Sequence, residues 1–246
     1  MMPAVEWTLG DPLTSVDRDR LRGSGVDAAS LAARQWRLVE DERLPDWWHA
    51  QGNRLCLAEG ATLPEPVVEQ LTLIPVHDAL VVVGSALHTL TSLLVGGDGA
   101  TVFIDAGCEL TAGDLFCGAG SRIVLHGPLV ATRGAVVDAR NGGSVVAGPE
   151  QLWAAGVYVA TDDMHRLEDR RTGERINPYG ADIRLGRHVW LCRESVVTGH
   201  ADIGDGAVVG MRSMVRGQKV PERCVVVGSP ARVVREDVTW SYDDRP

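Results

Sequence analysis

A six-residue repeat constrains the fold of this chain more than any other feature of its sequence. From Leu185 to Val220 the sequence divides into six consecutive blocks of six residues, each beginning with Leu, Val or Ile: LGRHVW, LCRESV, VTGHAD, IGDGAV, VGMRSM and VRGQKV. The fifth residue is small or branched in five of the blocks, and Lys219 is the exception. An aliphatic residue at every sixth position points inward from a short strand, and about three such strands complete one triangular coil. The pattern predicts an all-β solenoid of stacked coils.

The solenoid is expected to extend upstream in a less regular form. Between Leu71 and Val159, short runs rich in Val, Ile and Leu alternate with Gly, Asp and Asn, which are typical turn residues. We therefore assign residues 67–236 to the solenoid. The exposed strand edges at the end of a solenoid must be covered, and the segment after Val220 is expected to cap the C-terminal end.

The N-terminal part of the chain lacks the repeat. Residues 1–66 are charged and contain tryptophan, and we interpret them as a small cap or appendage that is partly helical. Residues 30–43 are expected to form an amphipathic helix, because their apolar side chains recur on one side. Trp47 and Trp48 are expected to pack within this region rather than to form a sugar-binding surface. Residues 237–246 are expected to form a tail.

Charge and cysteine usage exclude several classes of protein. The formal net charge of −9 disfavours general attraction to nucleic acid or to anionic membranes. The five cysteines are odd in number and widely spaced, so they form neither a disulfide framework nor a C-x-x-C metal pair. The N-terminus lacks the pattern of a signal peptide, and the longest apolar run, residues 79–87, is too short to span a bilayer. We expect a cytoplasmic protein with no integral membrane segment.

One segment interrupts the repeats and is the first candidate for function. Residues 161–182 are polar, charged and free of the six-residue period, and a long loop that leaves a rigid scaffold is a common place for functional residues. The loop contains His165, whose neutral imidazole can accept a proton from a hydroxyl group that attacks a thioester carbonyl. Asp163, two residues earlier, is a candidate to orient the ring or to stabilise the imidazolium.

A local reversal of charge gives a second indication. Between Gly206 and Arg235 the only acidic residue is Glu222, and six basic residues give this stretch a net charge of +5: Arg212, Arg216, Lys219, Arg223, Arg232 and Arg235. A basic patch suits a phosphorylated cofactor such as coenzyme A. Outward positions that happen to be arginine are the alternative explanation. The Gly-Ser-Pro-Ala-Arg sequence at residues 228–232 then adds a turn followed by an arginine available for a phosphate.

Taken together, these motifs resemble the hexapeptide-repeat acyltransferases, which fold as left-handed parallel β-helices. The resemblance is carried by the repeats, by His-Val-Trp-Leu at residues 188–191 and by Gly-x-Pro-Ala-Arg at residues 228–232. Three further patterns are most similar to bacterial polysaccharide and sialic acid O-acetyltransferases: Thr161-x-Asp163-x-His165, Gly173-x-Arg175-Ile176-Asn177 and Ile183-x-Leu185-Gly186-x-His188-Val189-Trp190. The match is specific over residues 157–240.

The resemblance implies a role for individual side chains in catalysis. His165 stands where the family has its catalytic histidine, and Trp190 stands at a tryptophan that lines the reaction site. The alternative for Trp190 is that it only covers a seam between subunits. Arg175 and Asn177 are expected to hold the loop in shape rather than to touch a ligand. The family is usually a trimer with active sites between neighbouring solenoids, so the resemblance implies a homotrimer.

The resemblance also implies acetyl-CoA as the acyl donor and assigns its binding residues. Gly210 and Ser213 occupy a stretch whose backbone meets the pantetheine arm, and Arg232 stands near the CoA phosphates. Arg216 and Lys219, in the basic stretch, complete the predicted cofactor site. The sequence departs from the family at two positions, which are Met211 in place of alanine and Cys192 in place of glycine.

We predict an O-acetyltransferase that acts on a carbohydrate hydroxyl in a capsule, an O-antigen or another glycan. Acylation of an amino sugar, a natural product or an antibiotic is an alternative, and a non-catalytic scaffold or assembly module is an alternative of another class. A zinc-dependent carbonic anhydrase of the same fold requires a His-x4-His pair, and no two of the seven histidines are five residues apart. We expect no metal site.

Overall fold

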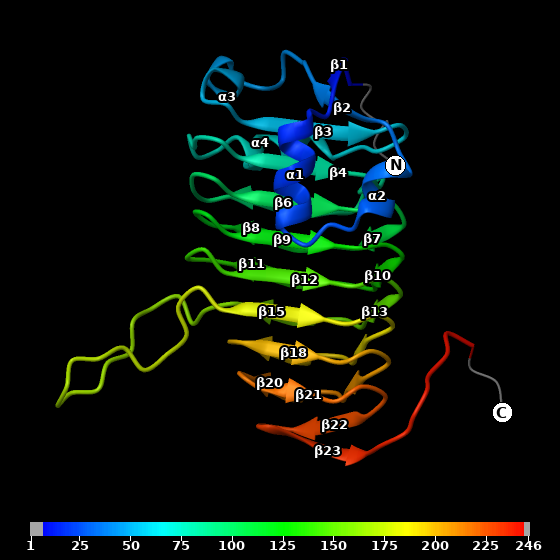
Figure 1. Ribbon diagram of the computed structural model, residues 1–246, viewed down its shortest axis with the longest axis vertical. Helices are drawn as coiled ribbons and strands as arrows, with labels where there is room; N and C mark the ends of the chain where they lie inside the picture. Colours follow the sequence, from blue (N-terminus) through cyan, green and yellow to red (C-terminus); the bar gives the residue numbers. More distant parts are fainter. Residues whose placement is uncertain (1–6, 244–246) are drawn as a thin grey trace.

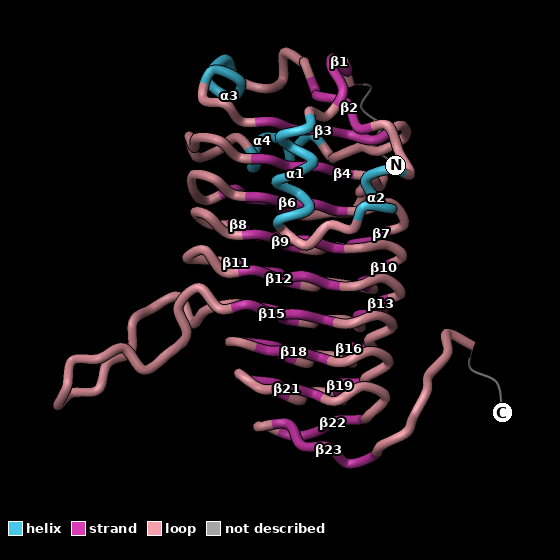
Figure 2. The backbone as a smooth tube through the Cα atoms, in the orientation of Figure 1, coloured by secondary structure: helices cyan, strands magenta, loops and turns pink. Residues whose placement is uncertain are grey.

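The computed structural model describes residues 7–243 and shows an elongated parallel β-solenoid of about seven turns (Figure 1). The predicted solenoid of stacked coils is therefore confirmed. Short strands joined by turns follow one another down the long axis, and helices are confined to the N-terminal end (Figure 2). No helix within residues 7–243 is long and apolar enough to cross a membrane.

Within residues 7–243 the strands form three sheets that run along the solenoid. The ten-stranded sheet contains, in spatial order, β1 (Leu9–Pro12), β2 (Trp36–Val39), β3 (Arg54–Ala58), β4 (Leu80–Val83), β6 (Thr101–Ile104), β9 (Arg122–Leu125), β12 (Ser144–Ala147), β15 (Asp182–Leu185), β18 (Ala201–Ile203) and β21 (Lys219–Val220). The seven-stranded sheet contains β23 (Ala231–Arg235), β22 (Val225–Gly228), β19 (Val208–Val209), β16 (Trp190–Leu191), β13 (Gln151–Trp153), β10 (Leu129–Ala131) and β7 (Cys108–Leu110). The six-stranded sheet contains β20 (Met214–Arg216), β17 (Val196–Thr198), β14 (Tyr158–Ala160), β11 (Val136–Ala139), β8 (Asp114–Cys117) and β5 (Ser92–Val95).

The register of the strands explains why the repeat is clear only near the C-terminus. Ile183 pairs with Ala201, 18 residues later, which is three blocks of six. Upstream, Ile123 pairs with Val145, 22 residues later, so the additional residues of that coil lie at its corners. The looser upstream pattern therefore belongs to the same solenoid, as predicted.

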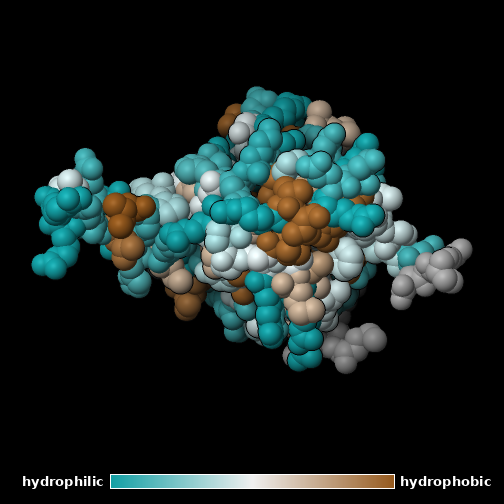
Figure 3. Space-filling model, turned by 90° about the horizontal axis from the view of Figure 1, so that it is seen from below, coloured by the Kyte–Doolittle hydropathy of each residue, from teal (hydrophilic) through white to brown (hydrophobic). Residues whose placement is uncertain are grey.

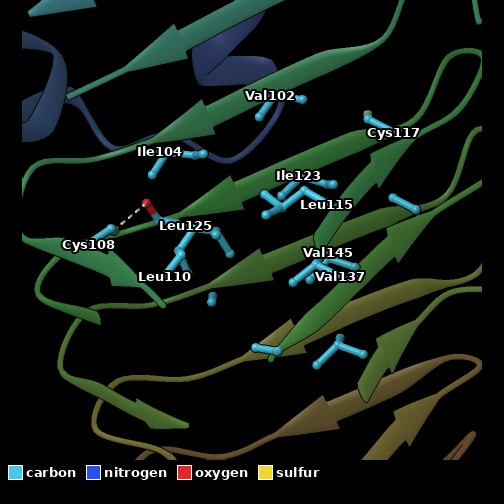
Figure 4. Packing of buried hydrophobic residues seen from close by; sticks show 14 of the residues in the cluster. Val102, Ile104, Cys108, Leu110, Leu115, Cys117, Ile123, Leu125, Val137 and Val145 are labelled. Carbon is cyan, nitrogen blue, oxygen red and sulfur yellow. Dashed lines mark hydrogen bonds between the residues drawn. The ribbon is translucent and has the colours of Figure 1, made fainter. Parts of the chain in front are cut away.

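The interior is filled by aliphatic side chains that stack from coil to coil. Leu115 is in register with Val137, which in turn is in register with Val159, and all three side chains are buried. Figure 4 shows Leu115, Val137 and Val145 among the side chains that point into this interior. Because each inward position lies above its equivalent in the next coil, the stacked strands share one continuous core.

The N-terminal region extends one sheet of the solenoid, adds side chains to the end of its core and also packs against its outer face. It contains four short helices within the described residues: α1 (Ser15–Gly23), α2 (Ala28–Ala32), α3 (Asp46–Ala50) and α4 (Glu65–Leu71). Helices α1 and α2 lie along the ten-stranded sheet (Figure 1), where Leu21, Leu31 and Trp36 form a second apolar cluster with Phe103 and Val124. Strand β3 pairs in parallel with β4, so this sheet runs without a break from the N-terminal strands β1–β3 into the solenoid.

The predicted amphipathic helix over residues 30–43 is wrong. Helix α2 ends at Ala32, and Trp36–Val39 forms strand β2, which is antiparallel to β3. Trp36 and Val39 are both buried, so the segment gains more from sheet pairing and burial than from its helical pattern. The packing role predicted for Trp48 is confirmed, because its side chain is fully buried.

The C-terminal end is capped by a reversal of chain direction. Strand β23 turns back antiparallel to β22, with Arg232 opposite Val227, and this hairpin ends the stack as predicted. It leaves Val227, Val233 and Val234 exposed. Figure 3 views this end of the solenoid and shows an apolar area surrounded by hydrophilic side chains.

Candidate active site

The predicted loop is an arm that projects from one edge of the solenoid between β14 and β15 (Figure 1). We call residues 161–181 the arm. Its two limbs run antiparallel, because Glu168 bridges to Arg175 and the Ile176 amide donates to the Leu167 carbonyl at 2.9 Å. The expected interruption of the repeats is therefore confirmed, and the arm has defined hydrogen bonds of its own.

His165 lies exposed near the base of the arm, as the last residue of a strained turn. Its backbone N–H donates to the carbonyl of Asp163 at 2.7 Å, and the intervening Met164 has a φ of 60°. This three-residue γ-turn is an unfavourable conformation for a residue other than glycine. Such strain persists only where the surrounding structure enforces it, and it is a common feature of functional sites. The turn presents the imidazole to solvent.

Asp163 contacts a different partner from the one predicted. Its carboxylate lies 3.3 Å from the guanidinium of Arg216 on β20, which is two strands away from β14 in the six-stranded sheet. Among the described residues, no side-chain hydrogen bond joins this carboxylate to the His165 imidazole; the two residues are linked through their backbones. The structure thus brings Asp163 together with Arg216, which the sequence analysis assigned to the cofactor.

The neighbouring Asp162 was missed by the sequence analysis and anchors the arm. Its side chain is buried, and its carboxylate accepts hydrogen bonds from the Gly180 amide at 2.9 Å and from the Thr161 hydroxyl at 2.9 Å. It therefore joins the two ends of the arm. Gly180 has a φ of 67° and approaches the backbone of Asn141 too closely for a side chain to fit. The sequence signal was the Thr-Asp-Asp run directly after an apolar strand.

Beneath the arm, the outer face of the six-stranded sheet carries a partly buried polar cluster. Asp138 lies in register with Phe116 and binds Arg140 through both carboxylate oxygens, at 2.7 and 2.9 Å. The Arg140 guanidinium stacks on Phe116 at 3.8 Å from the ring centroid. Burial raises the pKa of Asp138, although the hydrogen bond from Arg140 opposes the shift. Burial, together with the nearby Asp138, also raises the pKa of Tyr158 on the adjacent strand.

Trp190 belongs to β16 of the seven-stranded sheet, whereas His165 belongs to the arm, which joins β14 of the six-stranded sheet to β15 of the ten-stranded sheet. The C-terminal tail folds against Trp190 and His188. Trp240 lies 5.9 Å from Trp190 between ring centroids and stacks on His188 at 3.9 Å, with an interplanar angle of 6°. The Trp240 indole N–H donates to the His188 carbonyl at 2.9 Å. His188 is therefore half-buried beneath the tail.

Gly210 and Ser213 are both constrained by the terminal hairpin. Ser213 is buried, and its hydroxyl oxygen accepts a hydrogen bond from the Gly228 amide at 3.0 Å. A Cβ atom added to Gly210 would lie 2.7 Å from Val227. Both small residues are thus required by packing within the chain. Of the two departures from the family pattern, Met211 is exposed, whereas burial raises the pKa of the half-buried Cys192 to about 11.

The basic residues predicted to bind the cofactor are distributed over the three sheets. Arg216 ends β20 in the six-stranded sheet, Lys219 begins β21 in the ten-stranded sheet, and Arg232 belongs to β23 in the seven-stranded sheet. Lys219 lies 3.8 Å from Asp202, and Arg232 is exposed. Arg212, which contributed to the predicted patch, pairs with Glu194 at 2.6 Å. Basic residues therefore surround the C-terminal coils without forming a single cluster on one sheet.

No group of three or more His, Cys, Asp or Glu side chains within the described part of the chain is arranged to hold a metal ion. A cavity of about 190 Å³ lies at the N-terminal end, lined by Trp7, Arg43, Glu65, Val68, Glu69 and Thr72. It belongs to the opposite end of the solenoid from the terminal hairpin.

The fold and these residues define a β-solenoid of the hexapeptide-repeat class, and known proteins share parts of the sequence. No family model matches the chain. A putative lipopolysaccharide biosynthesis O-acetyl transferase, WbbJ, of Escherichia coli K12 is 33% identical over 101 residues, 38% of this chain and 50% of that protein. The galactoside O-acetyltransferase of the same organism is 36% identical over 94 residues, 38% of this chain and 44% of that protein. The chain thus spans about half the length of these relatives or less.

Solved structures share the fold over a longer stretch. The polySia specific acetyltransferase NeuO superposes with a TM-score of 0.60 and 23% identity, covering 70% of this chain and 78% of NeuO. The polysialic acid O-acetyltransferase OatWY superposes with a TM-score of 0.54 and 24% identity, covering 69% of this chain and 76% of OatWY. These superpositions show that the chain shares the β-solenoid fold of these proteins.

Proposed function

We propose that this chain transfers an acetyl group from acetyl-CoA to a hydroxyl group of a carbohydrate, with His165 as the general base. The observation that carries the proposal is the exposed imidazole held by a γ-turn on the arm of a hexapeptide-repeat solenoid. The neutral imidazole accepts the hydroxyl proton as the acceptor oxygen attacks the thioester carbonyl. The C–S bond then breaks, and the imidazolium returns the proton to the departing CoA thiolate.

The proposed acyl donor contacts the C-terminal coils. We assign the backbone near Gly210 and Ser213 to the pantetheine arm, and Arg216, Lys219 and Arg232 to the phosphates. The proposal is supported by the basic residues that surround the C-terminal coils, since coenzyme A carries a pyrophosphate and a 3′-phosphate. The pairing of Arg216 with Asp163 would also connect the cofactor to the arm.

We further propose that the active protein is a cyclic homotrimer. His165 and Trp190 belong to different sides of one solenoid, so a site that uses both is most simply completed by two copies. The arm also exposes Met164, Leu167 and Ile176, with 55–62% of each side chain accessible, and apolar side chains on a projecting segment favour contact with a second copy.

Thioester cleavage with acetyl-CoA, measured against a panel of sugars and glycans, tests the activity. We expect H165A to lower kcat on the order of 10²–10⁴-fold while CoA binding persists. The matched control is H88A, which removes an exposed histidine from an upstream coil and should leave kcat within about twofold. An H165A variant with more than about a tenth of the wild-type turnover would contradict the assignment of the base.

The same panel separates the alternatives. Amino sugars or chloramphenicol as the only acceptors would show that the acceptor class is wrong; 55 residues of the chain are 38% identical to the chloramphenicol acetyltransferase of Morganella morganii. Absence of both CoA binding and thioester cleavage would favour a scaffold.

Subunit mixing tests whether the site is shared. If His165 and Trp190 come from different copies, co-refolded H165A and W190A chains form some interfaces with both native residues and recover activity. Light scattering should give the mass of a trimer at micromolar concentration. Monomers with full activity would refute the proposed assembly.

A further inference from the structure

We propose that Asn177 is a positioning residue for His165, holding the catalytic turn through its side-chain carboxamide. This inference rests on the proposed role of His165 and extends it to a residue on the returning limb of the arm. The Asn177 side chain is only 7% exposed, although it belongs to a projecting segment. Its Nδ2 donates to the carbonyl of His165 at 2.7 Å, and its Oδ1 accepts from the Leu167 amide at 2.9 Å.

The two hydrogen bonds use opposite ends of one carboxamide. One end requires a donor because it faces a carbonyl, and the other requires an acceptor because it faces an N–H, so the orientation of the amide is determined. The contacted backbone groups belong to residues on either side of Arg166. Asn177 therefore fixes the path of the chain directly after the imidazole, and few other side chains could make both bonds in this geometry.

The turn before His165 explains why such support is needed. Met164 holds a φ of 60°, which an unsupported loop would relax. On the N-terminal side, the buried Asp162 anchors the arm through the Gly180 amide. On the C-terminal side, the bond from Asn177 to the His165 carbonyl is the contact that restrains the turn. The strained residue therefore lies between two buried polar side chains that belong to different limbs.

Asn177 is itself held in place by its neighbours. The Arg175 guanidinium donates to the carbonyls of Asn177 at 3.1 Å and Pro178 at 3.0 Å, and it lies 4.7 Å from the centroid of the Tyr179 ring. Pro178 packs over the Gly199 corner of the next coil. The Asn177 carboxamide is thus connected to the rigid solenoid. Its hydrogen bond to the His165 carbonyl therefore restrains the position of His165.

The test compares N177A and N177D with the wild type. N177A removes both hydrogen bonds. N177D keeps the shape of the side chain and the acceptor for the Leu167 amide, but at neutral pH it places a carboxylate oxygen against the His165 carbonyl. A positioning role predicts that N177D is at least as slow as N177A, with kcat lower by about 10- to 100-fold, because small displacements of a catalytic group have effects of this size. A purely structural role predicts instead that the thermal midpoint of both variants falls together with kcat.

The matched control is T172A at the tip of the arm, where the Thr172 hydroxyl accepts a hydrogen bond from the Glu174 amide at 3.2 Å. It also removes one hydrogen bond within the arm, but away from His165. We expect T172A to keep kcat within about twofold, and all three variants to keep the wild-type KM for acetyl-CoA and the wild-type thermal midpoint. Equal losses of kcat in T172A and the Asn177 variants would overturn the proposal, as would kcat within twofold of wild type in N177D.

A readout that does not depend on turnover separates this proposal from the proposed function. The backbone amide signal of His165 in NMR spectra, assigned by comparison with H165A, reports the γ-turn directly. In N177A and N177D it should shift and exchange faster with solvent, whereas in T172A it should remain as in the wild type. If the wild-type chain cleaves no thioester, the proposed activity fails, and this signal still decides whether Asn177 holds the turn. An unchanged signal in both Asn177 variants would overturn the positioning role.

Discussion

The carboxylate of Asp163 lies 3.3 Å from the guanidinium of Arg216, which joins the base of the arm to strand β20 across 53 residues of sequence. Both side chains are partly exposed, at 40% and 53%. The ion pair therefore links the candidate catalytic turn to a residue proposed to bind the cofactor. It also means that a phosphate arriving at Arg216 competes with a carboxylate that is already present.

Removal of this competition gives the first prediction. D163N should tighten CoA binding by about two- to fivefold at low salt, because an exposed ion pair is worth roughly 0–1 kcal/mol. Titration calorimetry with CoA measures the change. The control is E168Q, which removes an ion pair with Arg166 on the same arm and should leave the affinity unchanged. Weaker CoA binding in D163N would show that the Asp163 carboxylate and a CoA phosphate do not compete for Arg216.

Arg232 tests the phosphate contact at the terminal hairpin. Its guanidinium donates to the carbonyl of Ala231 at 2.8 Å and is otherwise exposed, so solvent screens any contact that it makes with a ligand. R232A should raise KM for acetyl-CoA by about two- to fivefold and leave kcat nearly unchanged. If Arg232 recognises the 3′-phosphate, dephospho-CoA substrates should be less affected by the substitution. Unchanged acetyl-CoA affinity at low salt would remove Arg232 from the cofactor site.

The stacking of Trp240 on His188 predicts that the tail contributes to stability. W240A removes an aromatic pair, worth about 0.5–1.5 kcal/mol, and the indole hydrogen bond, worth about 0.5–1.5 kcal/mol. Chemical denaturation should therefore show a loss of about 1–3 kcal/mol. W240F keeps a ring but loses the N–H donor, so its loss should be smaller. The same stability in W240A and the wild type would show that the tail does not hold this position in solution.

A pH-dependent prediction follows from Asp41 in the N-terminal region. The hydrogen bond from the Arg43 side chain lowers the pKa of Asp41, against the opposing effect of burial. A lowered carboxyl pKa stabilises the fold above the ordinary value near 3.9, and this contribution is lost as the pH falls through the lowered value. D41N should therefore cost about 1–3 kcal/mol at pH 7, with the difference from the wild type shrinking below about pH 4.

The control for Asp41 is D19N, which removes an exposed ion pair with Arg22. Its effect at pH 7 should stay within about 0.5 kcal/mol. Urea denaturation at pH 7 and pH 3 measures both variants. A D41N deficit that is constant over this pH range would show that the ionised carboxylate is not the stabilising species.

Much of the architecture can be predicted from the sequence, because a solenoid is built from local repeats. An aliphatic residue at every sixth position from Leu185 to Val220 determines which side chains point inward, and each coil contacts mainly its neighbours. The arm was predictable for the same reason, since residues that break the period cannot belong to a coil. His165 could therefore be located on a projecting segment from the sequence alone.

Residues 30–43 show where local reasoning fails. Their apolar spacing suits a helix, but Trp36 and Val39 are buried in a strand because β3 offers a partner edge. Pairing with a distant strand cannot be recognised from the spacing of a single segment. The same limit applies to Asp162 and Asn177, whose importance depends on backbone groups of the opposite limb of the arm.

The sequence by itself determined the solenoid, its capped C-terminal end, and the arm that carries His165. Only the tertiary structure decided which side chains on the outer faces of the solenoid contact one another. Successive strands along the chain belong to different sheets, so residues close in sequence point in different directions, whereas residues of different coils come together. For that reason Arg216, Lys219 and Arg232, which are neighbours in the sequence, lie on three different sheets, while Asp163 and Arg216 form an ion pair.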